Sequence, residues 1–95
     1  METNKVIVRA DRAGVFFGEI IERNGSEVKM KDVRRLWYWD GAASLSQLAV
    51  EGVSKPQNCK FTVTVTAMEI LGVIEIIPCT QKAVESINSV AVWRA

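Results

Sequence analysis

The stretch VFFGEIIERNGSEVKMK, residues 15–31, decides the fold. Val15 to Arg23 is apolar on both faces, as expected of a central strand, and Gly18 within it indicates a bulge or a close backbone approach. Asn24-Gly25 is the strongest short-range hairpin signal, because both residues tolerate positive φ. Glu27 to Lys31 then alternates apolar and charged side chains. Together these residues predict an antiparallel hairpin within a sheet.

Further strands are predicted on both sides of this hairpin. Short β-branched or alternating runs mark five of them: Lys5–Arg9, Arg34–Trp39, Phe61–Val65, Met68–Ile77 and Val90–Arg94. In the third run, strict alternation directs Phe61, Val63 and Val65 toward a core and the threonines between them toward water.

Two short helices are predicted between the strands. The first covers residues 43–51, with Ser44 as its cap, or Asp40 one turn earlier, and Gly52 as a C-terminal stop. The second begins after Thr80, which can cap it, and continues to about Ser89. Runs of strands with short turns and few helices predict an α+β fold. We expect a mostly antiparallel sheet, or a partly open small barrel, with both helices packed on it.

The length and composition fit one small domain, residues 1–95. With 48% hydrophobic and 24% charged residues, the chain has an ordinary globular composition. A chain of this size has little room for both a core and a deep pocket, so we expect a homo-oligomer whose binding sites are completed between subunits. The formal net charge of +1 argues against a general nucleic-acid binder.

Several kinds of chemistry are missing from the sequence. There is no histidine, which removes the commonest general base, metal ligand and partner of a nucleophile. Cys59 and Cys79 stand alone, without zinc or redox spacing, and no phosphate-binding glycine motif is present. We therefore expect no enzymatic activity, no cofactor and no metal. A pairing of the two cysteines stays open at this point.

The segments that direct a protein to a membrane or out of the cell are also not seen. The N-terminus METNKVIVRADR has no apolar signal-peptide core, and the longest apolar stretch, Ala67 to Cys79, is too short and too charged to cross a bilayer. The sequence therefore predicts a cytoplasmic protein with no membrane partner.

The stretch RRLWYWDGAASLSQ, residues 34–47, is the best candidate for a binding site. Trp37 and Trp39 on one strand face would give a flat surface for stacking a base or seating a partner's side chain. If a helix begins at the small residues near Gly41, its N–H groups could receive a phosphate with help from an arginine. The candidate binding residues are Arg34, Arg35, Trp37, Trp39, Asp40, Gly41, Ala42, Ser44 and Gln47. Alternatively the aromatic residues fill the core, Asp40 caps the helix and the arginines are solvated.

Two longer runs carry a family resemblance. WYWDGAASLSQLAVEG, residues 37–52, and IEIIPCTQKAVESINSVAVW, residues 74–93, resemble a family of small bacteriophage and prophage proteins with no assigned activity, as do the loop residues from Lys55 to Phe61. The resemblance implies a phage accessory protein that acts in the cytoplasm of a bacterial host.

That context favours a protein that works by stoichiometric binding. We expect it to counter a host defence system, either by sequestering a small phosphorylated nucleotide or by masking a host protein. A nucleotide site would need the tryptophans and arginines exposed in one groove, whereas masking a protein would need a flat aromatic and aliphatic patch. The alternative function is a structural or assembly component of the phage particle.

Overall fold

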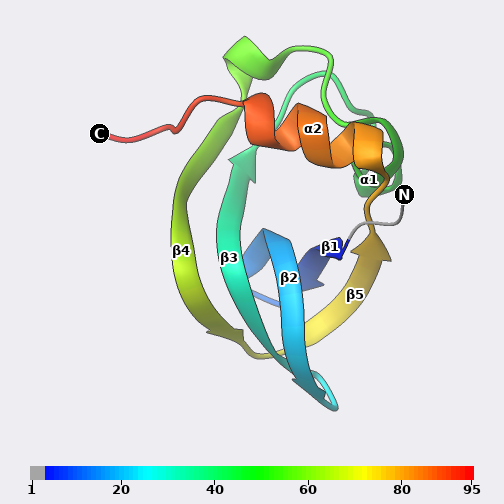
Figure 1. Ribbon diagram of the computed structural model, residues 1–95, viewed down its shortest axis with the longest axis vertical. Helices are drawn as coiled ribbons and strands as arrows, with labels where there is room; N and C mark the ends of the chain where they lie inside the picture. The colour runs from blue at the N-terminus through cyan, green and yellow to red at the C-terminus, as the bar shows by residue number, and fades with distance from the viewer. Residues whose placement is uncertain (1–3) are drawn as a thin grey trace.

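The computed structural model describes residues 4–95 and is built around one antiparallel sheet (Figure 1). The elements are β1 (Lys5–Ala10), β2 (Gly14–Asn24), β3 (Glu27–Tyr38), α1 (Leu45–Glu51), the 3-10 turn η1 (Pro56–Asn58), β4 (Lys60–Ile70), β5 (Val73–Pro78) and α2 (Gln81–Ser89). The five strands lie in the order β4-β3-β2-β1-β5, and each neighbouring pair is antiparallel. The predicted α+β class with a mostly antiparallel sheet and two short helices is confirmed.

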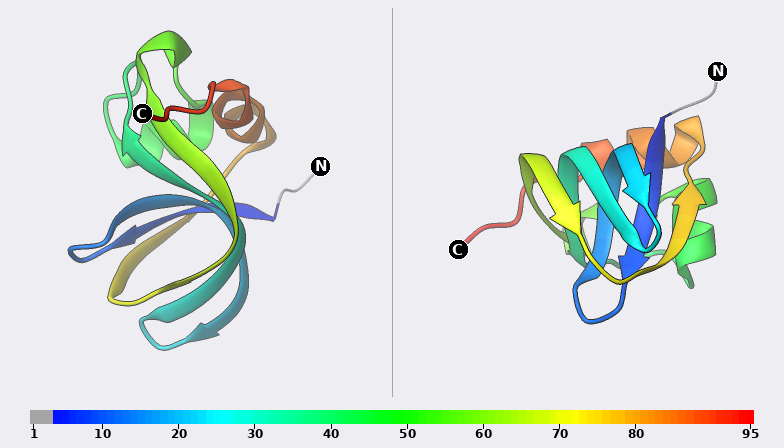
Figure 2. Two further views of the ribbon diagram at one scale, coloured as in Figure 1. Left: turned by 90° about the vertical axis from the view of Figure 1, so that its left-hand side faces the viewer. Right: turned by 90° about the horizontal axis from the view of Figure 1, so that it is seen from below.

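The sheet curls strongly but stays open. Figure 2 shows the curl, with β4 and β5 joined by a short turn although they are the two ends of the strand order. Within residues 4–95 these two strands do not pair with each other, so the barrel alternative is not supported. The outer edges of β4 and β5 are therefore the two edges of the sheet.

The predicted hairpin is confirmed, and Gly18 explains part of the curl. Gly25 has φ of +62° in the turn between β2 and β3, a conformation that glycine adopts without steric cost. A Cβ at Gly18 would lie 3.1 Å from the carbonyl oxygens of Lys31 and Asp32, and the β2–β3 register shifts at this point. Asp32 itself has φ of +52°. Gly18 thus permits the close approach that the bulge at Asp32 requires.

Each face of the sheet carries a cluster of buried residues, because neighbouring residues of one strand point to opposite faces. The cluster under the helices contains Ile7, Phe17, Leu36, Leu48, Ala49, Val53, Cys59, Phe61, Cys79, Ala83, Val84, Ile87 and Val90. The cluster on the other face contains Val8, Ala10, Phe16, Val28, Met30, Val33 and Ile70. This arrangement explains why the sequence around β2 is apolar at consecutive positions.

The strand predictions are wrong in two places. A single strand, β3, contains the run Glu27–Lys31 and the run Arg34–Trp39 as far as Tyr38. The bulge at Asp32 does not interrupt the strand, although we expected an interruption there. Met68 to Ile70 belongs to β4 and not to a second strand with β5, because Gly72, with φ of +72°, breaks the chain after Leu71.

Two further predictions also fail: in the described residues Val90–Arg94 is not a strand, and Val63 and Val65 are not buried. The chain end makes only an isolated parallel bridge between Phe61 and Val92, so no closing strand forms in the described residues. Val63 and Val65 are 43% and 37% exposed instead of buried, because no further element covers that part of β4.

Both predicted helices form, but the first begins at Leu45 and not at residue 43. The Ser44 hydroxyl accepts a hydrogen bond from the Gln47 N–H, so Ser44 and not Asp40 caps α1, and Gly52 follows its end. Thr80 caps α2 in the same way, through the Ala83 N–H. In the part of the chain that the structure describes, no helix has the length and apolar character needed to span a membrane.

Candidate functional site

The most exposed aromatic feature of the molecule is a pair of stacked indole rings. Trp37, near the end of β3, is 64% exposed, and Trp93 in the C-terminal tail is 43% exposed. Their ring centroids lie 6.5 Å apart with the planes inclined by 10°. The backbone N–H of Trp93 donates a 2.8 Å hydrogen bond to the Phe61 carbonyl, and this bond holds the tail beside the start of β4. We call Trp37 and Trp93 the indole pair.

The indole pair lies next to a cation. The Lys60 Nζ atom is 5.5 Å from the centroid of the Trp93 ring, within cation–π range. Lys60 is exposed, and its backbone pairs with that of Tyr38 at the β3–β4 edge. The surface therefore offers two flat apolar rings beside one positive charge.

Trp39 does not extend this surface, so the predicted double-tryptophan face is wrong. Trp39 is half-buried and packs, with Ala42, against the cluster under the helices. The strand ends at Tyr38, and the alternation that would place Trp37 and Trp39 on one face ends with it. Trp37 is thus part of the surface, whereas Trp39 and Ala42 contribute to the core.

Arg34 is buried and has a structural role. Its guanidinium donates to the carbonyls of Ile87 at 2.9 Å, Val90 at 2.6 Å and Thr62 at 2.9 Å. Only 6% of the residue is exposed, and burial lowers the pKa of the guanidinium. Two of the acceptors lie at the end of α2, where the arginine is a second donor to the Ile87 carbonyl, beside the Val90 N–H, and also donates to the Val90 carbonyl. Its charge faces the negative end of the helix dipole.

Arg35 points to the other side of the sheet. Its Nη1 atom donates to the Ala13 carbonyl at 2.6 Å, and the guanidinium carbon lies 4.5 Å above the Phe16 ring. Phe16 belongs to the cluster away from the helices, whereas Arg34 reaches into the helix side. The two arginines therefore do not converge on one anion.

The bend after β3 is closed by its own chain. The Asp40 carboxylate accepts a 2.9 Å hydrogen bond from the Asn58 side chain. Gly41, with φ of +94°, lies so close to the next loop that a Cβ would be 2.5 Å from the Ser54 nitrogen. The Ser54 N–H also donates to the Gly41 carbonyl at 3.2 Å. These contacts explain why small residues are found at the bend.

The start of α1 is likewise occupied by its own side chains. The helix begins at Leu45 and not near Gly41, so the predicted phosphate site at a Gly41 helix start does not form. Ser44 accepts from the Gln47 N–H at 3.1 Å, and the Gln47 Oε1 atom accepts from the Ala43 N–H at 2.8 Å. Ser44 and Gln47 thus satisfy the donors that a bound anion would use.

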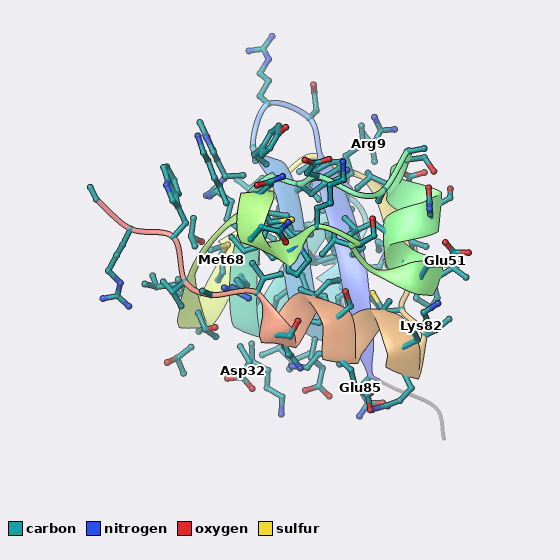
Figure 3. All side chains as sticks on the ribbon, turned by 90° about the horizontal axis from the view of Figure 1, so that it is seen from above. Arg9, Asp32, Glu51, Met68, Lys82 and Glu85 are labelled. Atoms are coloured by element: carbon teal, nitrogen blue, oxygen red, sulfur yellow. The ribbon has the colours of Figure 1, made fainter. Side chains whose placement is uncertain are left out.

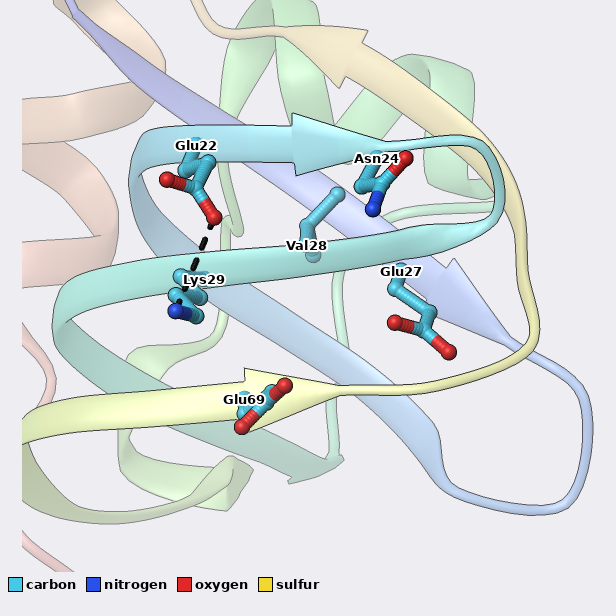
Figure 4. A pocket seen from close by; sticks show the side chains of 6 residues that line it. All are labelled: Glu22, Asn24, Glu27, Val28, Lys29 and Glu69. Carbon is cyan, nitrogen blue, oxygen red and sulfur yellow. Dashed lines mark ion pairs between the residues drawn. The ribbon is translucent and has the colours of Figure 1, made fainter.

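Several open hollows lie on the described surface, and two of them are lined by three or more charged or polar side chains. One, of about 210 Å³, lies between the bend and the helices, where Figure 3 shows Glu51 and Lys82 near each other; it is lined by Gly41, Gln47, Glu51, Gly52, Val53, Ser54 and Lys82. The other, of about 200 Å³, lies at the β2–β3 hairpin and contains three glutamates (Figure 4): its lining is Glu22, Asn24, Glu27, Val28, Lys29 and Glu69.

The charged side chains of the second hollow are partly paired with each other. In the second, the Lys29 ammonium pairs with the Glu22 carboxylate at 3.5 Å. Within residues 4–95 no group of three or more His, Cys, Asp or Glu side chains is arranged to hold a metal ion. Cys59 is a buried free thiol, so the two cysteines do not form a disulfide with each other. Cys79 is also buried, and burial raises the pKa of its thiol to about 11.

The comparison with protein families gives a match over most of the chain. A family model described as "Domain of unknown function (DUF6948)" matches residues 3–87. The chain belongs to this family. In this DUF6948 chain the match includes every candidate residue from Arg34 to Gln47 and ends before Trp93. No curated protein and no solved structure matches the chain.

Sequence reasoning missed the indole pair as a unit. The sequence separates its two members by the whole of β4, β5 and α2, and no local pattern connects them. The position of Trp93 shortly after α2 was a usable signal for the indole pair, because a short tail after this helix can return to the edge of the sheet.

Proposed function

We propose that this protein acts by stoichiometric binding of a host protein and not by catalysis, with the indole pair as its contact surface. The single observation behind the proposal is that Trp37 and Trp93 stack on each other while 64% of Trp37 and 43% of Trp93 stay exposed. Tryptophan is the residue type most enriched among the side chains that dominate protein interfaces, and a preformed stack loses little conformational freedom on binding.

The partner suited to this surface presents an apolar side chain with a carboxylate next to it. The apolar group would cover the exposed rings, and the carboxylate would pair with Lys60 at the rim. Oppositely charged rim groups favour correct orientation and fast association.

A protein partner fits this geometry better than a small nucleotide. The guanidinium of Arg34 is buried and bonded to carbonyls, and Arg35 lies on the opposite side of the sheet. The bend at Gly41 and the start of α1 are occupied by side chains of the chain itself. The groups expected to hold a phosphate are therefore already used within the fold.

The proposed setting is a phage accessory protein in the host cytoplasm that counters a defence system by masking one of its proteins. It rests on the resemblance of residues 37–52 and 74–93 to small phage proteins. The alternative, a role in the assembly of the phage particle, predicts that the protein is found in purified virions.

The experiment compares three versions of the chain. Wild type, Trp37→Ser and the control Ile74→Ser are used to capture proteins from host lysate, and each captured protein is then purified and titrated by calorimetry. Ile74 is as exposed, at 59%, but lies on β5 at the other edge of the sheet. We expect a defined stoichiometry for wild type and the control, and affinity at least about tenfold weaker for Trp37→Ser.

Two results would contradict the proposal. One is equal affinity of Trp37→Ser and wild type for the same partner. The other is a large thermal shift with cyclic or ADP-ribose-type nucleotides, because a ligand at a hundredfold excess over its Kd stabilises the folded state by about 2.7 kcal/mol. The second result would restore the nucleotide hypothesis.

A further inference from the structure

The outer edge of β4 lacks the features that usually protect a sheet edge. β4 ends the strand order, so alternate N–H and C=O groups along it point away from β3. Within the described residues the C-terminal tail pairs with this edge at Phe61, through Val92 and the Trp93 N–H. From Thr62 to Met68 the strand has no charged residue, proline or glycine. Such an edge readily pairs with another strand.

The opposite edge of the sheet is protected in the expected ways. β5 has only six residues, includes Glu75 and ends at Pro78. Glu75 pairs with Arg9 at 3.1 Å. A charged side chain and a proline are common means of preventing association between sheet edges. The contrast indicates that the open edge of β4 is available for a specific contact.

The sequence of β4 is suited to pairing with itself. Residues 62–66 read TVTVT, which is the same in both directions. When two identical strands pair antiparallel about a two-fold axis, the numbers of any two residues that lie opposite each other add up to the same total. An axis at Thr64 places Thr64 opposite Thr64, Val63 opposite Val65, and Thr62 opposite Thr66 of the second copy. Thr–Thr and β-branched pairs of this kind stabilise antiparallel sheets.

The tail limits the edge at the position where the palindrome starts. The contact of Val92 and Trp93 with Phe61 occupies the edge just before Thr62. Because the tail already occupies the edge at Phe61, the ladder between the two copies is limited to residues 62–66 of each chain. The free edge and the self-complementary stretch therefore begin at the same residue.

Exposed valines on this strand give a second, independent reason for pairing. Val65 is paired with Val33, which is buried on the face away from the helices, yet Val65 is 37% exposed. Val63, two residues earlier on β4, is 43% exposed. A second copy would bring Val65 of that copy beside Val63, and cover both side chains.

We propose that two copies of this chain form a two-fold dimer by antiparallel pairing of β4 with β4, centred on Thr64. The five-stranded sheets of the two chains then form one continuous sheet. The inference stands on the edge and its sequence, and it does not depend on the function of the indole pair.

The first test measures the mass of the protein in solution by sedimentation equilibrium. Wild type is expected at twice the 10.6 kDa of one chain. Thr64→Lys places two ammonium groups opposite each other at the axis, and is expected at the mass of one chain with unchanged circular dichroism. Ile74→Lys, on the protected edge, is the control and is expected to stay dimeric. A monomeric wild type, or a dimeric Thr64→Lys, would overturn the proposal.

The second test uses a disulfide and does not depend on destabilising the dimer. Thr64→Cys brings two thiols together at the axis, where mild oxidation is expected to link two chains, whereas Ile74→Cys is expected to remain a single chain. The native Cys59 and Cys79 are buried, so they give little background. Equal linking of both variants, or none in Thr64→Cys, would contradict the pairing.

Discussion

The two sides of the β3–β4 strand pair are built in opposite ways. On the side of the helices, Arg34 binds the carbonyls that end α2, and within residues 4–95 no buried side-chain nitrogen or oxygen lacks a partner. At the outer edge, Trp37, Trp93 and the valines of β4 stay exposed. The difference indicates that the helix side holds the fold together, whereas the outer edge is free to make contacts with other molecules.

The two sides also differ in what a substitution should do. Changes on the helix side leave buried polar groups without partners or create cavities, and both mechanisms are costly. Changes at the outer edge remove side chains that water already contacts. Measurements of stability on matched pairs of residues from the two sides can therefore test the comparison.

The largest effect is expected at Arg34. Arg34→Met keeps the apolar part of the side chain but removes the arginine's hydrogen bonds to the carbonyls of Thr62, Ile87 and Val90. Because a hydrogen bond from a charged group contributes ~1.5–3 kcal/mol, we expect the free energy of unfolding to fall by about 3–5 kcal/mol, measured by urea denaturation. Arg35→Met is the control and should cost about 1 kcal/mol, because its hydrogen bond to Ala13 is exposed and its cation–π contact with Phe16 contributes about 0.5–1 kcal/mol. Equal losses for the two arginines would contradict the structural role of Arg34.

The next effect is a pH dependence at Cys79. Burial raises the pKa of this thiol from 9.0 to about 11, so the folded state favours the neutral thiol. The resulting stabilisation is complete below pH 9 and is lost as the pH rises toward 11, because the unfolded chain loses the proton first. Between pH 8 and 10.5 wild type should lose about 2 kcal/mol more than Cys79→Ala, which has no thiol to titrate there. Parallel stability curves for the two proteins would contradict the burial of the thiol.

The local parts of the fold could be predicted from the sequence because local chemistry specifies them. Asn24-Gly25 requires a tight turn, and Ser44 and Thr80 each offer a hydroxyl to the first turn of a helix. Alternation also predicts which residues of one strand share a face. It fails where the pairing is irregular, as at the Asp32 bulge, or where a strand stops, as after Tyr38.

The candidate site was harder to predict because it depends on contacts between distant segments. Two adjacent arginines look alike in the sequence, yet one meets the end of α2 and the other meets Phe16. The alternation of Phe61, Val63 and Val65 predicts burial of all three on one face, but the β3–β4 register shifts between Phe61 and Thr64. Phe61 therefore enters the cluster under the helices, whereas Val65 lies opposite Val33 of the other cluster. No local pattern in the sequence marks this shift.

The smallest effect on stability is expected at Trp37, although it is the bulkiest side chain of the three. Trp37→Ser removes a ring that is already 64% exposed, and the loss should be about 0.5–1.5 kcal/mol, the usual value of an aromatic pair. Leu36→Ala, one residue earlier but only 2% exposed, should cost about 2–5 kcal/mol. Urea denaturation of both variants gives the comparison directly. If Trp37→Ser cost as much as Leu36→Ala, the indole pair would be part of the core. Its rings would then be needed for the fold, and the outer edge would no longer offer them to a partner.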